Sequence, residues 1–95
     1  MTDEELELLV AGRHRDPHRF LGLHEGIVRV YRPGATAMRL VTATETADMK
    51  MIHPAGVFEG RLDLDPGERV DYELEAGYEQ EGSESTYRFG DPYRS

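Results

Sequence analysis

Short stretches in which apolar and polar residues alternate, separated by turn-forming residues, constrain the fold of this chain most. The most regular stretch, residues 70–76, alternates apolar and acidic residues without a break, as in a strand with one buried face. Similar patterns predict further strands over residues 27–31, 37–41, 50–53, 57–64 and 86–89. Turn signals follow at intervals of about 8–12 residues, which favours a β-sandwich. We therefore predict a mainly β fold: an immunoglobulin-like (early-set) β-sandwich of six or seven strands.

One short helix is expected ahead of the strands. Residues 2–5 (TDEE) match a capping box, in which the threonine and the last glutamate bond each other's backbone amides. An apolar stripe at helical spacing follows, formed by Leu6, Leu9 and Val10. Gly12 is suited to end the helix. The pattern predicts a helix over about residues 3–11.

The chain length and the absence of cysteine limit the fold further. A chain of 95 residues is expected to form one domain, which we divide into a helix with its connector (1–14) and a sandwich (15–95). Without cysteine, neither a disulfide nor a thiolate zinc site is possible. No apolar run approaches the roughly 18 residues of a membrane span, and the N-terminus is acidic where a signal peptide is basic. We therefore expect a cytoplasmic location and no membrane partner.

Negative charge is concentrated in the second half of the chain. The net charge is −8, and residues 59–84 hold ten acidic residues against two arginines. Because this segment would repel a phosphate backbone, no nucleic-acid partner is expected. The ordinary interpretation is a solvated acidic face that keeps the domain in solution. No combination of nucleophile, base and orienting group is visible, so we expect no catalytic residue and no cofactor.

Residues 13–24 (RHRDPHRFLGLH) hold three of the four histidines and are the most chemically dense segment. Two histidines there have the i, i+4 spacing of a ligand pair on a helix, but the intervening proline breaks that helix. We expect no metal site but a tight turn with a cap, one helical turn, two apolar anchors and a glycine stop. The residues of this turn are Asp16, Pro17, Phe20, Leu21 and Gly22. The candidates for contact with a partner domain are Arg13, Arg15 and His18.

Two tyrosines, Tyr78 and Tyr87, flank residues 79–85, which are polar and are expected to form a loop. Exposed aromatic faces pack on sugar rings, so these tyrosines are candidates for a weak glucan-binding platform. An ordinary cross-strand hairpin pair is the alternative interpretation. The aromatic residues expected in the core are Phe20, Phe58, Tyr72 and Phe89.

Six blocks of sequence extend over most of the chain. They are LVAGRH (9–14), DPH (16–18), LGLH (21–24), VRVYRPGA (28–35), HPAGVFEG (53–60) and DPYR (91–94). In this order they resemble the opening of a bacterial 1,4-α-glucan (glycogen) branching enzyme. The resemblance implies that the chain is the first β-sandwich of a larger enzyme, with a carbohydrate-binding sandwich, a (β/α)₈ barrel and a C-terminal β domain after it.

The resemblance also implies what the chain does. In the family, which belongs to glycoside hydrolase family 13, the barrel cuts an α-1,4-glucan and rejoins the piece through an α-1,6 link. None of the barrel is in this chain, so we expect an excised, non-catalytic accessory domain that supports the enzyme and its chain-length preference. Its expected partners are the other domains of the enzyme, and α-glucan or glycogen by way of the parent enzyme. The alternatives are a stand-alone weak α-glucan-binding module and an intramolecular docking domain.

Overall fold

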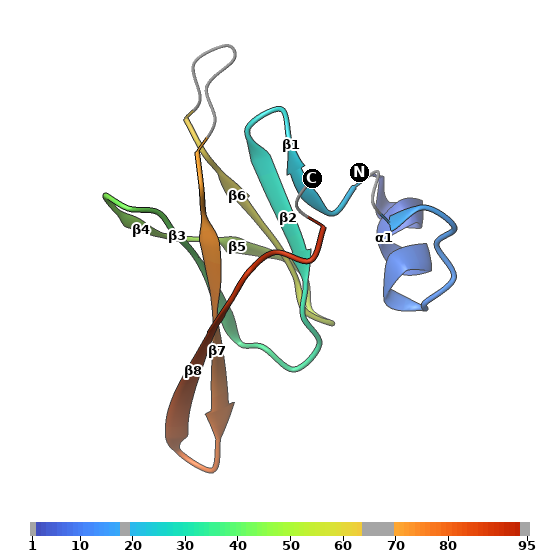
Figure 1. The fold of residues 1–95 in the computed structure, drawn as a ribbon. Helices are drawn as coiled ribbons and strands as arrows, with labels where there is room; N and C mark the ends of the chain where they lie inside the picture. The colour runs from blue at the N-terminus through green and yellow to red at the C-terminus, as the bar shows by residue number, and fades with distance from the viewer. Residues whose placement is uncertain (1, 18–19, 64–69, 94–95) are drawn as a thin grey trace.

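The computed structural model describes residues 2–17, 20–63 and 70–93, and its strands form two four-stranded antiparallel sheets (Figure 1). Sheet A has the strand order β1-β2-β6-β5, and sheet B has the order β4-β3-β7-β8. The elements are α1 (Asp3–Val10), β1 (Gly22–His24), β2 (Ile27–Tyr31), β3 (Ala37–Val41), β4 (Thr46–Asp48), β5 (Lys50–His53), β6 (Val57–Arg61), β7 (Glu73–Gln80) and β8 (Ser83–Phe89). The predicted mainly β sandwich with one short N-terminal helix is confirmed. Its immunoglobulin-like type stays a prediction.

The predicted strands correspond to β2, β3, β5, β6, β7 and β8, and the first three of these match to the residue. β6 ends at Arg61 rather than Leu64, which lies outside the described residues. The described residues form eight strands rather than six or seven, because β1 and β4 were not expected. Each is three residues long, too short to show an alternating pattern, and every residue of β4 is exposed.

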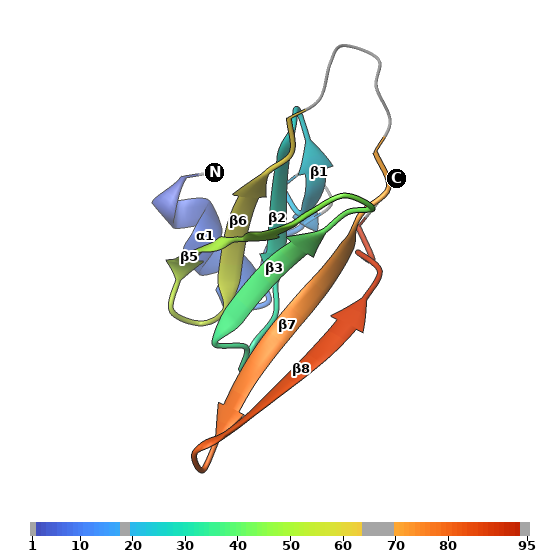
Figure 2. The ribbon, with the colours of Figure 1, turned by 90° about the vertical axis from the view of Figure 1, so that its left-hand side faces the viewer.

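The prediction of a loop over residues 79–85 is wrong, because β7 and β8 continue through this segment as a hairpin. Their pairing extends to Gln80 and Ser83, which leaves a turn at residues 81–82 with φ of 50° and 79°. Two successive positive φ angles are typical of the tight turn that matches strand twist. Since β7 pairs with β3 only as far as Gly77, the end of the hairpin projects beyond the sandwich (Figure 2).

The main core lies between the two sheets. In β2 and β3 every second residue is buried, as expected for strands with one face in the core. The buried residues of this cluster are Val28, Val30, Ala35, Met38, Leu40, Met49, Phe58, Tyr72, Leu74 and Ala76. Of the four aromatic residues predicted in the core, Phe58 and Tyr72 are fully buried, whereas Phe20 and Phe89 are half-buried.

Helix α1 covers part of the outer face of sheet A (Figure 1). Leu6 and Leu9 of the helix form a second buried cluster with Leu21 and Val57. Val57 neighbours the core residue Phe58 in β6, so its side chain points to the opposite side of sheet A. The helix therefore encloses apolar surface that would otherwise face water.

The predicted capping box begins α1. The Glu5 amide donates to Thr2 Oγ1 over 3.2 Å, and the Thr2 amide donates to Glu5 Oε1 over 3.3 Å. Desolvation acts to raise the pKa of the Glu5 carboxyl, but the hydrogen bonds from Thr2 and the nearby His14 lower it below its ordinary value. The ionised carboxylate is thus the form that suits the helix start.

The outer face of sheet B is charged rather than apolar. Arg39 contacts both Asp48 and Glu75, with nitrogen–oxygen distances of 3.2 Å each, and Arg88 Nη2 lies 3.5 Å from Glu75 Oε2. These four side chains form a row of alternating sign across β4, β3, β7 and β8. A row of charged side chains indicates that this face of sheet B contacts solvent. Exposed ion pairs of this kind contribute little to stability.

Candidate functional site

The β7–β8 hairpin carries three aromatic rings around one arginine, and we take this group as the candidate functional site. The core continues along one face of the hairpin, called here the inner face, through Leu74 and Ala76. Strand alternation and the β7–β8 register place Tyr78, Tyr87 and Phe89 on this same face. Together with Arg32, which follows β2, these rings are called the hairpin cluster.

Arg32 holds the hairpin cluster together. Its Nε donates a hydrogen bond of 2.6 Å to Tyr78 Oη. Its guanidinium carbon lies 4.5 Å from the centroid of the Phe89 ring and 5.5 Å from that of Tyr87, where a cation is attracted to the negative ring face. The Tyr87 and Phe89 rings are stacked, with centroids 5.8 Å apart and planes 14° from parallel. The arginine therefore fixes all three rings relative to one another.

Tyr87 is the most exposed ring of the hairpin cluster, at 54%, while Tyr78 and Phe89 are half-buried. Further toward the turn, the inner face carries the exposed polar residues Gln80, Ser83 and Ser85. The opposite face of the same segment carries the facing pair Glu79 and Glu84. One face of the projecting hairpin is therefore aromatic and neutral, and the other is acidic.

The structure brings the two predicted platform tyrosines together through Arg32. They are not a directly facing pair, because Tyr78 lies opposite Ser85 and Tyr87 lies opposite Ala76. Their role in glucan binding stays a prediction.

The sequence reasoning missed Arg32 altogether and assigned Phe89 only to the core. The i, i+2 spacing of Tyr87 and Phe89 would have placed both rings on one strand face. No local signal marks Arg32, which lies 46 residues from its hydrogen-bond partner, Tyr78.

At Pro17, where a capped helical turn was predicted, the described residues show two backbone hydrogen bonds. Residues 18–19 lie outside the described residues, and the turn as a whole stays a prediction. The Pro17 carbonyl accepts from the amides of Phe20 and Leu21, over 3.1 and 2.8 Å. Leu21 is buried in the cluster under α1, as an anchor should be. Phe20 is half-buried, and its ring meets the edge of the His14 ring at 5.0 Å. The Asp16 amide donates to His14 Nδ1 over 3.0 Å, so one of the histidines supports the turn.

Gly22 joins this turn to the C-terminal segment. It has a φ of 86°, and a Cβ at this position would lie 2.5 Å from the Tyr93 carbonyl oxygen, so only glycine fits. The segment is held by Asp91, whose Oδ2 accepts from Tyr72 Oη over 2.6 Å and whose Oδ1 accepts from the Tyr93 amide over 2.9 Å. Asp91 is itself buried. These contacts explain why position 22 is a glycine and position 91 an aspartate.

The predicted docking residues Arg13 and Arg15 are both exposed, and His18 lies outside the described residues. A cavity of about 260 Å³ opens next to the chain neighbours of the two arginines, Gly12 and His14. It is lined by Leu9, Gly12, His14, Pro17, Leu21, Tyr31 and Tyr93. The placement of the two arginines is compatible with contact to another domain, which stays a prediction.

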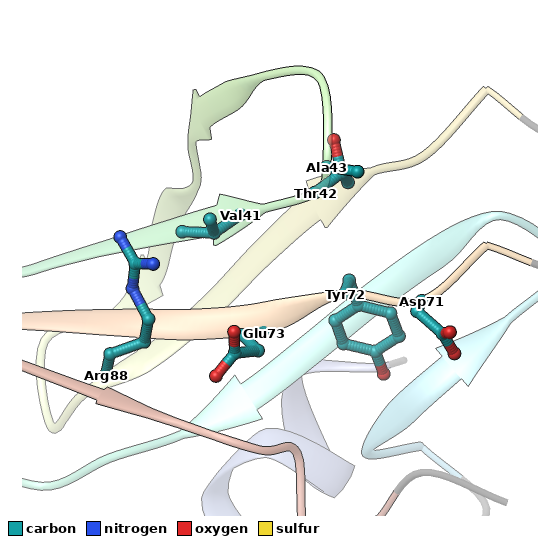
Figure 3. Close-up of a pocket in the computed structure, with 7 residues that line it drawn as sticks. All are labelled: Val41, Thr42, Ala43, Asp71, Tyr72, Glu73 and Arg88. Atoms are coloured by element: carbon teal, nitrogen blue, oxygen red, sulfur yellow. The ribbon is translucent and has the colours of Figure 1, made fainter.

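A second hollow, of about 310 Å³, lies at the end of sheet B where β7 begins. It is lined by Val41, Thr42, Ala43, Asp71, Tyr72, Glu73 and Arg88 (Figure 3). Figure 3 shows the Asp71 and Glu73 carboxylates on either side of Tyr72. Within the described ranges, no group of three or more potential metal ligands exists, and this hollow contains no arrangement of nucleophile and base. We therefore assign no chemistry to it.

Comparison with known proteins identifies relatives over nearly the whole chain. A family model described as the N-terminal domain of the alpha-1,4-glucan branching enzyme GlgB matches residues 2–93. The chain is 35% identical to the 1,4-alpha-glucan branching enzyme GlgB of Frankia casuarinae, in an alignment that covers 96% of this chain and 11% of the relative.

Two other relatives give the same result. The GlgB enzyme of Rhodospirillum rubrum is 39% identical over 92% of this chain and 14% of the relative. That of Nitrobacter winogradskyi is 41% identical over 95% of this chain and 12% of the relative. The chain thus spans about one eighth of the length of the proteins it matches.

Proposed function

This chain belongs to the family of N-terminal domains of alpha-1,4-glucan branching enzymes, and from that premise we propose that it is a non-catalytic accessory domain of such an enzyme. The observation that carries the proposal is the family match over residues 2–93. The matched relatives are named for the activity of the whole protein, of which this chain corresponds to 11% to 14%. The domain supports the enzyme and its preference for the length of the transferred chain.

The proposed partners are the other domains of the same enzyme, and α-glucan or glycogen as the substrate of the whole protein. The proposed role belongs to bacterial glycogen biosynthesis in the cytoplasm. Among the described residues, no helix is long and apolar enough to cross a membrane. The acidic residues of the segment 59–84 would repel nucleic acid. We treat residues 1–14 and 15–95 as parts of one domain, because α1 shares a buried cluster with Leu21 and Val57.

The test measures the activity of the isolated chain and, separately, that of an enzyme without the matching segment. The 95-residue chain incubated with amylose is expected to leave the iodine absorbance and the chain-length profile unchanged. In the Rhodospirillum rubrum enzyme, deletion of the matching N-terminal segment is expected to shift the transferred chain lengths or lower Tm. Replacement of that segment by this chain is expected to restore both.

Two results would contradict the proposal. If the isolated chain shortens or branches amylose, the domain is catalytic. If the deletion changes neither product length nor stability, the domain does not support the enzyme.

Arg13, Arg15 and His18 are the proposed contacts to a neighbouring domain. The observation that favours this docking role is that both arginines are exposed next to an open cavity lined by Leu9 and Tyr93. Inter-domain surfaces within a chain are of moderate size and rather polar, which suits a basic rim.

The docking role is tested by charge reversal. The double variant Arg13→Glu, Arg15→Glu is expected to lower the Tm of the full-length enzyme and leave that of the isolated chain unchanged. Arg61→Glu, on the exposed end of β6, is the matched control. Equal effects of both variants on the full-length enzyme would count against a docking role for the connector.

A further inference from the structure

We propose that the inner face of the β7–β8 hairpin is a binding site for an α-1,4-glucan chain, in which Tyr87 and Phe89 carry a sugar ring and Arg32 donates hydrogen bonds to its hydroxyls. The proposal rests on the proposed function, since a branching enzyme handles such chains. It extends the glucan platform predicted at Tyr78 and Tyr87 by two residues, Arg32 and Phe89, and by an arrangement that the sequence did not indicate.

The aromatic pair provides the surface on which a sugar ring packs. The C–H groups on one face of a pyranose carry partial positive charge and are attracted to the negative face of an aromatic ring. Tyr87 is more than half exposed, and its ring lies nearly parallel to that of Phe89. The stacking against Phe89 holds the exposed Tyr87 ring in a fixed orientation for such a contact.

Arg32 provides the polar contacts. Its hydrogen bond to Tyr78 Oη uses Nε, and the guanidinium fork carries further N–H donors on its terminal nitrogens. The bond to Tyr78 and the contact with Phe89 hold that fork in one place. A donor that is already fixed loses less conformational entropy when a ligand binds.

The charge distribution favours a neutral ligand. The exposed inner face beyond the rings carries Gln80, Ser83 and Ser85, whose amide and hydroxyl groups both donate and accept. The carboxylates of Glu79 and Glu84 belong to the opposite face. A polyhydroxylated chain matches such a face. Arg32 is the cation of the hairpin cluster, and the nearby carboxylates of Glu79 and Glu84 oppose its attraction for an anion.

The shape of the hairpin favours an extended ligand over a protein domain. Beyond Gly77 the hairpin projects past β3, as Figure 2 shows, and the inner-face residues Gln80, Ser83 and Ser85 are exposed there. Of the exposed large apolar side chains among the described residues, only Tyr87 belongs to this face, while Leu8 and Met51 lie on α1 and β5. A protein interface usually has a larger apolar centre.

The experiment is a titration of the ¹⁵N-labelled 95-residue chain with maltoheptaose, followed by NMR. The amides of Gln80, Ser83, Ser85 and Tyr87 are expected to shift together and to saturate, with a Kd of about 1 mM. Cellohexaose, a β-linked glucan of different curvature, is the ligand control and is expected to give smaller shifts.

Three variants assign the contacts. Tyr87→Ala and Arg32→Ala are each expected to weaken binding about tenfold. Thr86→Ala, which changes the adjacent exposed residue on the opposite face, is the matched control and is expected to bind as the parent chain does. A ¹⁵N spectrum of each variant without ligand shows whether the fold is retained. If Arg32→Ala does not fold, the binding of Tyr87→Ala tests the proposal alone. The Tyr87 side chain is exposed, so its removal is expected to leave the fold intact.

Two outcomes overturn the proposal. The first is a flat response of these amides up to about 10 mM maltoheptaose. The second is a shift of the same amides when the remaining domains of the enzyme are added, with none from maltoheptaose, which would make the face an inter-domain surface. Neither outcome bears on the accessory role itself, which fails if the isolated chain shortens or branches amylose, or if the N-terminal deletion leaves product length and stability unchanged.

Discussion

Two regions of the molecule differ in how much apolar surface they leave exposed. On the outer face of sheet A, α1 encloses Leu6, Leu9, Leu21 and Val57. At the end of sheet B, the β7–β8 hairpin projects past β3 and leaves Tyr87 more than half exposed. The chain covers the first apolar surface with its own helix and leaves the second exposed. The cluster under α1 is therefore expected to determine stability, and the hairpin end to determine binding.

Glycines show the same difference. Gly22, next to the cluster under α1, lies against the Tyr93 carbonyl. Gly82, in the hairpin turn, has open space around the position of a Cβ. Both have positive φ, at 86° and 79°. Comparable backbone conformations thus occur in a packed and in an unpacked environment.

The largest expected effect comes from emptying the cluster under α1. Leu9→Ala removes a buried side chain from this cluster and is expected to lower the free energy of unfolding by about 3 kcal/mol. Leu8→Ala, on the same helix but with an exposed side chain, is the control and should cost less than about 1 kcal/mol. Urea unfolding measures both. Similar losses for the two variants would mean that the helix does not pack as described.

A glycine pair separates backbone strain from packing. Gly22→Ala combines a strained φ with a contact to the Tyr93 carbonyl oxygen, and is expected to cost about 2–3 kcal/mol. Gly82→Ala meets only the strained φ and is expected to cost about 1 kcal/mol. Thermal unfolding of both variants tests the difference. If Gly82→Ala is the more damaging, the hairpin end contributes more stability than we infer.

The cap of α1 is expected to contribute less. Thr2→Ala removes the acceptor for the Glu5 amide and should cost about 1 kcal/mol at neutral pH. Because the pKa of Glu5 is lowered in the folded chain, its stabilising contribution is present above the glutamate pKa of the unfolded chain and is lost as pH falls through the folded value. The difference in the free energy of unfolding between the parent chain and Thr2→Ala should therefore shrink in acid. Urea unfolding at neutral pH and at a pH below the folded pKa of Glu5 measures this change. Thr44→Ala, in an exposed turn, is the control. Its free energy of unfolding should differ from that of the parent chain by an amount that does not depend on pH.

The smallest effect is expected at the hairpin cluster. Tyr87→Ala removes an exposed ring and is expected to change the free energy of unfolding by less than about 1 kcal/mol. The same variant is expected to bind glucan about tenfold more weakly, so stability and binding separate at this residue. A loss as large as that of Leu9→Ala, measured in the same urea series, would show that the ring is part of the core instead.

Much of the fold could be predicted because period-2 burial is a local signal. The segments 27–31 and 37–41 alternate as strands of a sandwich must, and the structure has them as β2 and β3. The segment 79–85 misled because its residues are polar and lie outside the core. It forms a strand pair because its register continues from the pair of the buried Leu74 and the half-buried Phe89. Pairing of this kind is set by neighbours rather than by composition.

The candidate site was only partly predictable, for a related reason. Tyr78 and Tyr87 stand out in the sequence because they are aromatic residues beside a polar segment. Arg32 does not, because its role depends on a contact with Tyr78 that forms only when the two sheets have assembled. The positive φ of Gly22 fits its predicted place at the end of a turn, because glycine acts through local backbone preferences.

The acidic face of the hairpin has a consequence for association between copies of the chain. β8 is an edge strand of sheet B, and past Gly77 β7 has none of the described strands on its other side, so the projecting segment has two open backbone edges. Such edges invite strand addition by a second molecule. Glu79 faces Glu84 across the hairpin, and this like-charge pair costs some stability within one molecule. It also repels the equivalent carboxylates of another, so salt that screens the repulsion should make self-assembly along these edges easier.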